Sequence, residues 1–324
     1  MTCSVVSPSF AAVERVWAAM ARDQAEASVF LTPQWHASWW ERFGGGLDLR
    51  LLLVGDEASP LGIAPMCYAD GTLSFLGGTD LVDYHDFVFG ASDPARFFAE
   101  AARCLDAEEW RTLDLTSIRE TSPTLEHLPG LLRGRGYRVS VEREDTAPGL
   151  ALPASWDDYL AGLTKKDRHE LRRKLRRLER ADGYRLVLSE PGALAADVGA
   201  LIDLMRESHE EKRGFMAPER EAFFRGMALE MSEAGMLRLF SLEVNGQTAS
   251  AAVCFDFMGR RLLYNSGYNV AMREYSAGLL LKALTIRHAI DEGLGYYDFL
   301  RGDEPYKYDL GASDVLLYHI RAER

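Results

Sequence analysis

The sequence predicts an α+β fold that is present twice in a chain of 324 residues. Three observations carry this prediction. Short apolar runs are joined by turn signals, helix-length segments flank them, and the same order of segments occurs in both halves of the chain. The offset between matching strands stays between 184 and 190 residues. Agreement of several consecutive segments at nearly one offset indicates an internal repeat, so we expect two mixed, mostly antiparallel sheets, each flanked by helices.

The repeat consists of a meander of three strands, a helix and a closing strand. Its segments are 50–54, 61–66, 73–77, 93–109 and 113–115 in the first half, and 238–242, 249–254, 263–267, 276–293 and 297–299 in the second. Asn245-Gly246, between two apolar runs, is a strong signal for a two-residue hairpin turn. Antiparallel strands joined by such turns, followed by a helix and one more strand, are typical of an α+β domain.

Further helices are expected outside the repeat. The segments with helical periodicity or capping signals are 9–26, 34–43, a short helix after Ser155, 165–181, 191–211 and 218–234. Thr32-Pro33 provides an N-cap with proline at the first helical position. The Pro- and Gly-bearing stretch 146–149 then separates two expected domains, residues 1–148 and 149–324.

Bulk composition excludes several classes of protein. A net charge of −12 argues against a general nucleic-acid binder, and no run of 18 uncharged apolar residues is present. No export signal is visible, so we expect a cytoplasmic protein that does not insert into membranes. Cys3, Cys67, Cys104 and Cys254 are scattered, which predicts reduced thiols and no metal site. The charge is uneven, because residues 1–150 hold 12 arginines, no lysine and 22 acidic residues.

The segment 298–307 is the most informative stretch of the chain. A short apolar run ends there in Arg301, Asp303, Glu304, Tyr306 and Lys307, arranged around a glycine and a proline. Charges crowded at the end of a core strand are costly unless they face solvent or a ligand. In open α/β sheets ligands bind beyond strand ends, so this segment is the expected floor of a site.

These elements together resemble the GNAT acyltransferase superfamily in its tandem form. The most specific residues are 298–302 with Glu304, Tyr306 and Lys307, and the tryptophan-rich opening 31–43. Within the superfamily the chain is most similar to the CelD-like family, associated with cellulose and exopolysaccharide synthesis, and to the related Fem-type aminoacyl transferases. The resemblance implies transfer of an acyl group from a thioester or ester donor to an amine or hydroxyl.

The resemblance also places a donor loop before the second helix of the repeat. There the chain has Arg273, Ser276, Ala277 and Gly278, followed by a helix that runs from Leu279. Exposed backbone N–H groups at a helix N-terminus bind anions, and small residues let a pyrophosphate approach. We therefore expect an acyl-CoA donor, acetyl-CoA in the first place, in the second domain. The alternative is a serine-capped helix with a surface arginine.

The first domain has an acidic segment at the matching place. Asp83, Tyr84 and Asp86 lie in it, and an anionic donor would be repelled there. We expect these residues to line the acceptor site instead and to attract an amine or a polyol bound between the two domains. The alternative is a solvated acidic loop.

The residues after the closing strand are expected to carry the chemistry. The superfamily commonly keeps its acid there, so the resemblance implies that Tyr306 protonates the leaving sulfur. Asp303 or Glu304 is the expected base, provided that burial raises its pKa. Arg301 and Lys307 would hold an anionic part of a substrate. The alternative is an ion-pair cluster that fixes the terminal turn.

Two neighbouring residues are candidates for acceptor binding. Asn265 and Tyr268 lie at the end of the strand that should diverge beside this cluster, and their side chains can form hydrogen bonds. The alternative is a turn built on Gly267.

The segment 165–180 is unusually basic. It holds nine lysines and arginines, although Asp167, Glu170 and Glu179 interrupt it. Such a helix can bind tRNA phosphates or present a solvated face.

The sequence thus predicts an N- or O-acyltransferase that moves an acyl group from acyl-CoA to an amine or sugar. One alternative is a Fem-like transferase that uses aminoacyl-tRNA. The other is a non-catalytic scaffold in polysaccharide or envelope assembly, which the Ser276 departure from the superfamily's glycine would favour.

Overall fold

The computed structural model describes residues 4–5, 9–24, 26–56, 59–90, 92–181, 183–208 and 210–324; Cys3 lies outside them. The chain forms two compact units. The first consists of residues 1–146 together with 315–324, and the second of residues 147–314.

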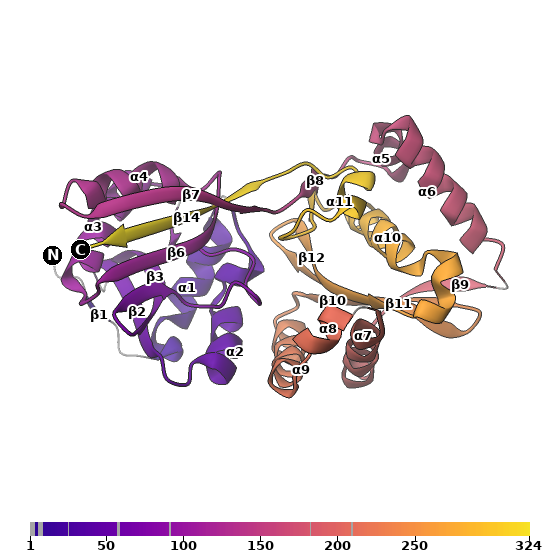
Figure 1. Cartoon of the computed structure of the whole chain (residues 1–324), viewed down its shortest axis with the longest axis horizontal. Helices are drawn as coiled ribbons and strands as arrows, with labels where there is room; N and C mark the ends of the chain where they lie inside the picture. The colour runs from indigo at the N-terminus through magenta and orange to yellow at the C-terminus, as the bar shows by residue number, and fades with distance from the viewer. Residues whose placement is uncertain are drawn as a thin grey trace. The chain divides into compact units, whose positions relative to one another are not determined.

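The first unit is a mixed sheet flanked by helices (Figure 1). Its strands are β1 (Ser4–Val5), β2 (Asp48–Asp56), β3 (Ser59–Ala69), β4 (Thr72–Phe75), β5 (Val88–Phe89), β6 (Thr112–Arg119), β7 (Arg138–Thr146) and β14 (Leu316–Glu323). Its helices are α1 (Phe10–Asp23), the 3₁₀ helix η1 (Val29–Leu31), α2 (Pro33–Phe43), α3 (Pro94–Ala107) and α4 (Pro123–Arg133). The strand order is β1-β2-β3-β4-β6-β14-β7, and β5 pairs with β3.

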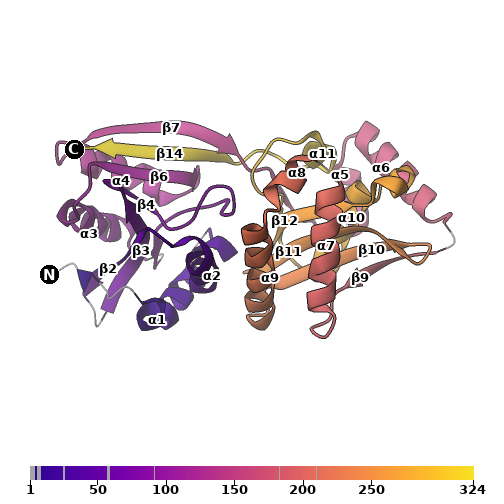
Figure 2. The ribbon, with the colours of Figure 1, turned by 60° about the horizontal axis from the view of Figure 1, so that its bottom comes forward.

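The second unit is a sheet with the order β8-β13-β12-β11-β10-β9. Its strands are β8 (Gly149–Ala151), β9 (Tyr184–Leu188), β10 (Leu237–Val244), β11 (Gln247–Phe257), β12 (Arg260–Tyr268) and β13 (Tyr296–Asp298). Its helices are α5 (Trp156–Gly162), α6 (Lys165–Leu178), α7 (Leu194–Ser208), α8 (Glu210–Phe215), α9 (Pro218–Glu233), the 3₁₀ helix η2 (Val270–Tyr275), α10 (Ala277–Asp291) and α11 (Pro305–Asp309). Helices α7 and α9 pack on one face of the sheet and α10 on the other, with α6 against α10 (Figures 1 and 2).

The predicted α+β architecture, with two sheets flanked by helices, is confirmed. In each unit an antiparallel meander (β2-β3-β4 and β10-β11-β12) is followed by a helix and a strand. That last strand pairs in parallel with the end of the meander, β6 with β4 and β13 with β12. The predicted hairpin turn is also present, since Asn245 and Gly246 both have positive φ between β10 and β11.

The end of the chain differs from the predicted domain division. We expected residues 149–324 to form the second domain, but β14 pairs with β6 and β7 of the first unit. Pairing between strands that are far apart in the sequence leaves no local pattern, so residues 316–323 did not reveal the partners of this strand.

Capping residues set the start of three helices, and two of these caps, Thr32 and Ser155, were indicated by the sequence. The side chains of Thr32, Ser155 and Thr164 accept hydrogen bonds from the backbone N–H groups of Trp35, Asp158 and Asp167. Each cap satisfies an N–H that has no partner within its helix, which fixes the first turn of α2, α5 and α6.

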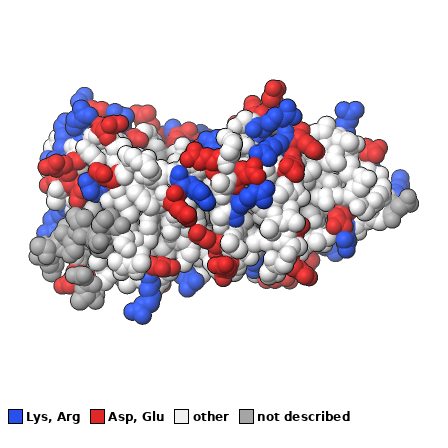
Figure 3. Space-filling model, turned by 90° about the horizontal axis from the view of Figure 1, so that it is seen from below, with Lys and Arg blue, Asp and Glu red and all other residues white. Residues whose placement is uncertain are grey.

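On the face drawn in Figure 3, acidic and basic side chains are interspersed among uncharged ones. In the described part of the chain, no helix is long and apolar enough to cross a membrane. Cys67 and Cys254 are free, but Cys104 is disulfide-bonded, which corrects the expectation of reduced thiols throughout. Sequence spacing does not show which thiols the fold brings within bonding distance.

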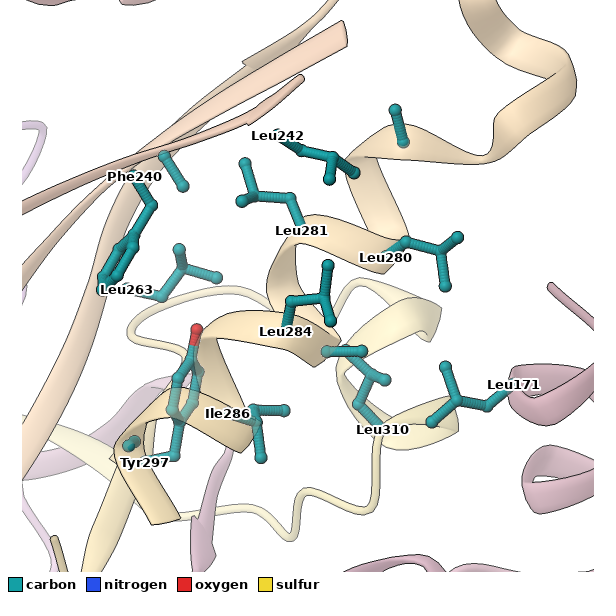
Figure 4. Packing of buried hydrophobic residues seen from close by; sticks show 14 of the residues in the cluster. Leu171, Phe240, Leu242, Leu263, Leu280, Leu281, Leu284, Ile286, Tyr297 and Leu310 are labelled. Carbon is teal, nitrogen blue, oxygen red and sulfur yellow. The ribbon is translucent and has the colours of Figure 1, made fainter. Parts of the chain in front are cut away.

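Helix α10 lies at the centre of the second unit's core (Figure 4). Leu280, Leu281 and Leu284 pack among Phe240 from the sheet and Leu310 after α11. A helix covered by a sheet on one side and by other helices on the other must be apolar on most faces. This explains the long apolar run of α10, and it makes any charged residue in the run conspicuous.

Candidate active site

The site of the second unit begins where two parallel strands part. The pairing of β12 with β13 runs from Arg260–Tyr296 to Leu262–Asp298, but β12 continues to Tyr268. A pocket of about 580 Å³ lies beyond this point. Its walls come from α8, the end of β12, the η2–α10 connection, the first two turns of α10, and the residues that begin α11. The predicted donor loop and part of the predicted strand-end cluster therefore line one pocket.

At the N-terminus of α10, the donor loop leaves some backbone N–H groups without an acceptor among the described residues. Ser276 has φ 53° and ψ 36°, a left-handed conformation, and its side chain makes no capping bond to α10. The backbone N–H groups of Leu279 and Leu280 donate to Ser276 O, whereas those of Ala277 and Gly278 have no acceptor among the described residues. Two free N–H groups at the positive end of a helix dipole, beside the cation Arg273, suit a phosphate or pyrophosphate.

Gly278 is needed for more than the approach of a ligand. A Cβ added there would lie 3.2 Å from Cδ1 of Tyr268 and 3.5 Å from its Cγ. The glycine thus allows the first turn of α10 to sit directly against the Tyr268 ring, and both residues line the pocket. All five predicted donor residues, Arg273, Ser276, Ala277, Gly278 and Leu279, line it too.

The strand-end cluster divides into two parts. Lys307 is buried and its Nζ donates to the carbonyl oxygens of Leu300, Arg301 and Gly302 at 2.9, 2.7 and 2.9 Å. Leu300 has φ 61°, and its N–H donates to Asp298 Oδ1. Lys307 therefore holds a strained turn in place and does not line the pocket, contrary to the expected anion-binding role. The sequence placed Lys307 in the strand-end cluster, but it did not show that the Lys307 amine turns away from the pocket and toward the backbone carbonyl groups of the turn.

Glu304 and Tyr306 line the pocket, whereas Arg301 and Asp303 do not. Burial favours the neutral form of Glu304, but the hydrogen bond and charge of Lys307, 2.9 Å away, outweigh it and hold its pKa below the ordinary value. This is the opposite of the shift that a general base requires. Asp303 is exposed to solvent.

Tyr306 brings a phenol to the pocket wall. Burial raises the pKa of its phenol above the ordinary value, and the charge of Glu304 adds to the effect, so the hydroxyl is protonated at neutral pH. Within the described chain the hydroxyl has no hydrogen-bond partner, and its ring packs on Phe299. The hydroxyl is free to meet a ligand in the pocket.

Two lysines that the sequence analysis missed also line the pocket. Lys282 of α10 is buried, and its Nζ donates to Gly278 O at 3.1 Å and lies 4.7 Å from the centroid of the Tyr306 ring. Lys212 of α8 donates to Asn265 Oδ1 at 3.1 Å and to Ser266 O. The available signal was the position of Lys282, a lone charge inside the apolar run 277–286.

The predicted acceptor residues of β12 have different surroundings. Tyr268 lines the pocket, but Asn265 binds the Lys212 amine and the backbone N–H of Ser266. Gly267 forms no turn. It lies within β12 opposite Ala251, and a Cβ added there would lie 2.3 Å from Met205 N of α7. The glycine is explained by this close approach of helix and strand.

The acidic segment of the first unit is not a solvated loop. Tyr84 and Asp86 are buried. The Asp86 carboxylate accepts hydrogen bonds from Ser122 Oγ, Thr124 Oγ1 and Phe87 N. Burial raises the pKa of Asp86 against these bonds. The Asp86 carboxylate thus holds two hydroxyls at the start of α4. The Tyr84 ring packs against Phe30 and Arg119, and Asp83 is half-buried. The sequence analysis expected these side chains to be exposed because it considered the charge of the segment, and the sequence alone did not show that they are buried.

Most of the second unit is similar to a known family of domains. Residues 165–308 match the model of the family described as an acetyltransferase (GNAT) domain. This match lies within the second unit. Its donor loop, the diverging strands β12 and β13, and Tyr306 all lie within the matched range. No curated protein sequence matches the chain.

Solved structures show a similar fold over the whole chain. The crystal structure of FemX has a TM-score of 0.68 at 11% identity, covering 98% of this chain and 97% of that one. A conserved protein of unknown function from Bacteroides thetaiotaomicron gives 0.66 at 12% identity, with both chains covered fully. The C-terminal DUF2156 domain of a proposed lysylphosphatidylglycerol synthetase from Agrobacterium fabrum gives 0.61 at 12% identity, covering 98% and 92%. At such identities the likeness shows the fold alone.

Proposed function

We propose that the protein is an acyltransferase whose second unit binds an acyl-CoA, acetyl-CoA in the first place, and transfers the acyl group to an amine or to a sugar hydroxyl. One observation carries the proposal. A single pocket joins the free N–H groups of Ala277 and Gly278, the cation Arg273 and the unpartnered hydroxyl of Tyr306. The first three groups suit the phosphates of a carrier, and the fourth suits a leaving thiolate.

The residues present fit such a carrier. Helix α10 has 15 residues, which is long enough to provide a dipole. Its first two residues, Ala277 and Gly278, have a methyl group and no side chain, respectively, so the backbone there is accessible. The left-handed Ser276 leaves the backbone open in the way that a glycine would, so the departure from the superfamily pattern does not close the loop. Tyr306 holds its proton until a thiolate forms. The acyl-CoA supplies an activated thioester carbonyl, and the protein supplies position and protons.

A melting experiment tests the proposal. We expect acetyl-CoA to raise the Tm of the wild-type protein, because ligand that binds only the folded state stabilises it. Arg273→Ala should reduce this shift by removing a charge-assisted contact. Arg287→Ala, which removes a half-exposed cation from the far end of the same helix, is the matched control and should leave the shift unchanged. Equal shifts in all three proteins would contradict the role of the donor loop, and no shift with any acyl-CoA would favour the scaffold.

A second candidate is an aminoacyl-tRNA donor, and helix α6 favours it. Arg177 Nη1 of α6 donates to Glu274 O in the donor loop at 2.9 Å. One hollow of about 780 Å³ is lined by residues of the helix that are basic except for Glu170. Another of about 350 Å³ is lined by three arginines of the helix and by Arg180 just after it. Arg176 lines both. A basic surface that adjoins the donor loop suits the phosphates of an RNA carrier.

Salt dependence separates the two candidates. For the RNA donor, log Kd for tRNA should rise steeply with log salt concentration. Arg172→Gln with Arg176→Gln should lower the slope by about 1 for each phosphate that the protein no longer binds. A protein whose Tm responds to acetyl-CoA but whose weak tRNA binding is unchanged by these substitutions uses the coenzyme.

A further inference from the structure

The proton of the acceptor has no recipient among the predicted residues. An amine or hydroxyl that attacks a thioester must lose one proton. Glu304 is held ionised by Lys307, which weakens it as a base, and Asp303 is exposed outside the pocket. The group that takes the proton must line the pocket near Tyr306 and must be able to exist uncharged.

Lys282 meets these geometric requirements. Its side chain is 8% exposed, and it reaches the pocket from the second turn of α10. Its Nζ donates to one acceptor, Gly278 O, so the nitrogen has remaining capacity that no described protein group uses. The same nitrogen lies over the Tyr306 ring at 4.7 Å. The amine is therefore beside both the donor loop and the proposed acid.

We propose that Lys282 is the general base of the transfer reaction, accepting the proton of the attacking amine or hydroxyl. This inference rests on the proposed function and gives a role to a residue that the sequence analysis did not name. The attacking nitrogen or oxygen forms a bond to the acyl carbon and gives its proton to Lys282 Nζ. The carbon–sulfur bond breaks, and the thiolate takes a proton from Tyr306. Lys282 and Tyr306 are left as neighbouring ammonium and phenolate, and transfer of one proton between them restores both.

The charges around Lys282 are consistent with this role. Burial lowers the pKa of its amine to about 7, and the Lys212 ammonium across the pocket acts in the same direction. Lys307 of α11 also disfavours the ammonium, whereas Glu304 before α11 and Cys254 of β11 favour it. Tyr306 faces it with an uncharged ring. A group with a pKa near the working pH can both take up and release a proton.

The test measures thiol release from acetyl-CoA, with water and with glucosamine as acceptors, across roughly pH 5.5–9, a range that brackets the pKa expected of a general base. Wild-type rates should rise with pH to a plateau, with a midpoint near 7. Lys282→Met, which keeps the length and removes the base, should lower the rate about 100-fold or more and abolish that midpoint. Lys282→Arg should be as slow, because guanidinium keeps the charge but cannot accept a proton. Both variants should keep the Tm shift with acetyl-CoA, which shows that they fold and bind donor.

A further variant tests the electrostatic setting. Lys212→Gln removes a like charge, so the midpoint of the remaining activity should move to higher pH. Arg287→Met, on the outer side of α10, is the control and should leave rate and midpoint unchanged.

Two results would overturn the assignment. One is a Lys282→Met or Lys282→Arg protein with a wild-type rate and pH profile. The other is a wild-type protein that binds acetyl-CoA but releases no thiol with either acceptor, because a base beside the donor should accelerate at least hydrolysis. Failure of the proposed function itself has a different signature, in which the wild-type protein shows no Tm shift with acetyl-CoA.

Discussion

Lys282 is the residue at which the chemistry of the site and the stability of the fold oppose each other. In the folded protein the pKa of its amine is about 7, against an ordinary value of 10.5. Between these two pH values the unfolded chain binds one proton that the folded chain does not, so stability should rise with pH across this window. Below the folded-state pKa both states are protonated, and the cost of burying the ammonium is fully present.

Lys282→Met should therefore stabilise the protein. We expect a gain on the order of 3 kcal/mol at about pH 6 and less than about 1 kcal/mol at about pH 10, measured by urea unfolding at both values. The stabilised variant should be the inactive one, as is common where a site stores an unfavourable charge. A gain of equal size at both pH values would show that the lysine is not destabilised by its charge.

Tyr306 is predicted to act in the chemical step only. Tyr306→Phe removes the proton donor and leaves the ring that packs on Phe299, so turnover should fall about 100-fold while the Tm shift with acetyl-CoA stays near that of the wild type. Assays of thiol release together with melting curves check both halves of the expectation. Unchanged turnover would remove Tyr306 from the mechanism.

Ser276 tests the backbone of the donor loop. A non-glycine residue in the left-handed region costs on the order of 1 kcal/mol, and the Ser276 side chain makes no capping bond that would offset it. Ser276→Gly should therefore stabilise the protein by about 0.5–1 kcal/mol and keep donor binding. Ser276→Ala retains the strain, so its free energy of unfolding should stay close to that of the wild type, and a similar gain in both variants would refute the explanation.

At the scale of residues, the sequence predicted the site best where the position of a residue in the backbone determines whether it lines the pocket. The donor loop was located because its place in the repeat fixes it, and all five of its predicted residues line the pocket. Side-chain direction was harder to predict. Nothing in the spacing of 298–307 shows that Lys307 turns inward to three carbonyl oxygens while Tyr306 faces the pocket, because both follow from the left-handed turn at Leu300.

Among the elements, β12 and α7 approach each other closely at Gly267. Gly267→Ala would place a methyl group 2.3 Å from Met205 N and 2.4 Å from Leu204 C, which are backbone atoms that cannot rotate away. We expect a loss of about 2–3 kcal/mol in the free energy of unfolding. Gly226→Ala in α9, where an added Cβ meets nothing within 4 Å, is the control and should be neutral or slightly stabilising. A tolerated Gly267→Ala would mean that α7 can shift on the sheet.

The sequence predicted helices correctly where helical periodicity and a capping residue occur together. The basic helix predicted over 165–181 is α6 (Lys165–Leu178), and the helix predicted over 276–293 is α10 (Ala277–Asp291). The predicted helix 191–211 corresponds to α7 (Leu194–Ser208) and the start of α8 (Glu210–Phe215), and residue 209 between them lies outside the described residues. The pairing partners of β8 and β14 were missed, because the sequence of each strand does not identify the distant strand with which it pairs in the fold.

At the scale of the whole molecule, the first unit depends on the last ten residues of the chain. Removing residues 315–324 deletes the strand between β6 and β7 and exposes the core around Ile320. In limited proteolysis we expect residues 1–146 of the truncated protein to be cut first, while acetyl-CoA continues to protect the second unit. Ile320→Asp, which buries a charge in the same core, should have the same effect in the full-length chain. Uniform resistance of the truncated protein would show that β14 is dispensable.

The placement of β14 has a consequence for biosynthesis. A ribosome completes residues 147–314 before the strand that fills the gap between β6 and β7 has left the exit tunnel. The unit whose synthesis starts first can therefore complete its sheet only after residues 147–314 have been synthesised, and until then it presents two unfilled strand edges to chaperones and to other nascent chains.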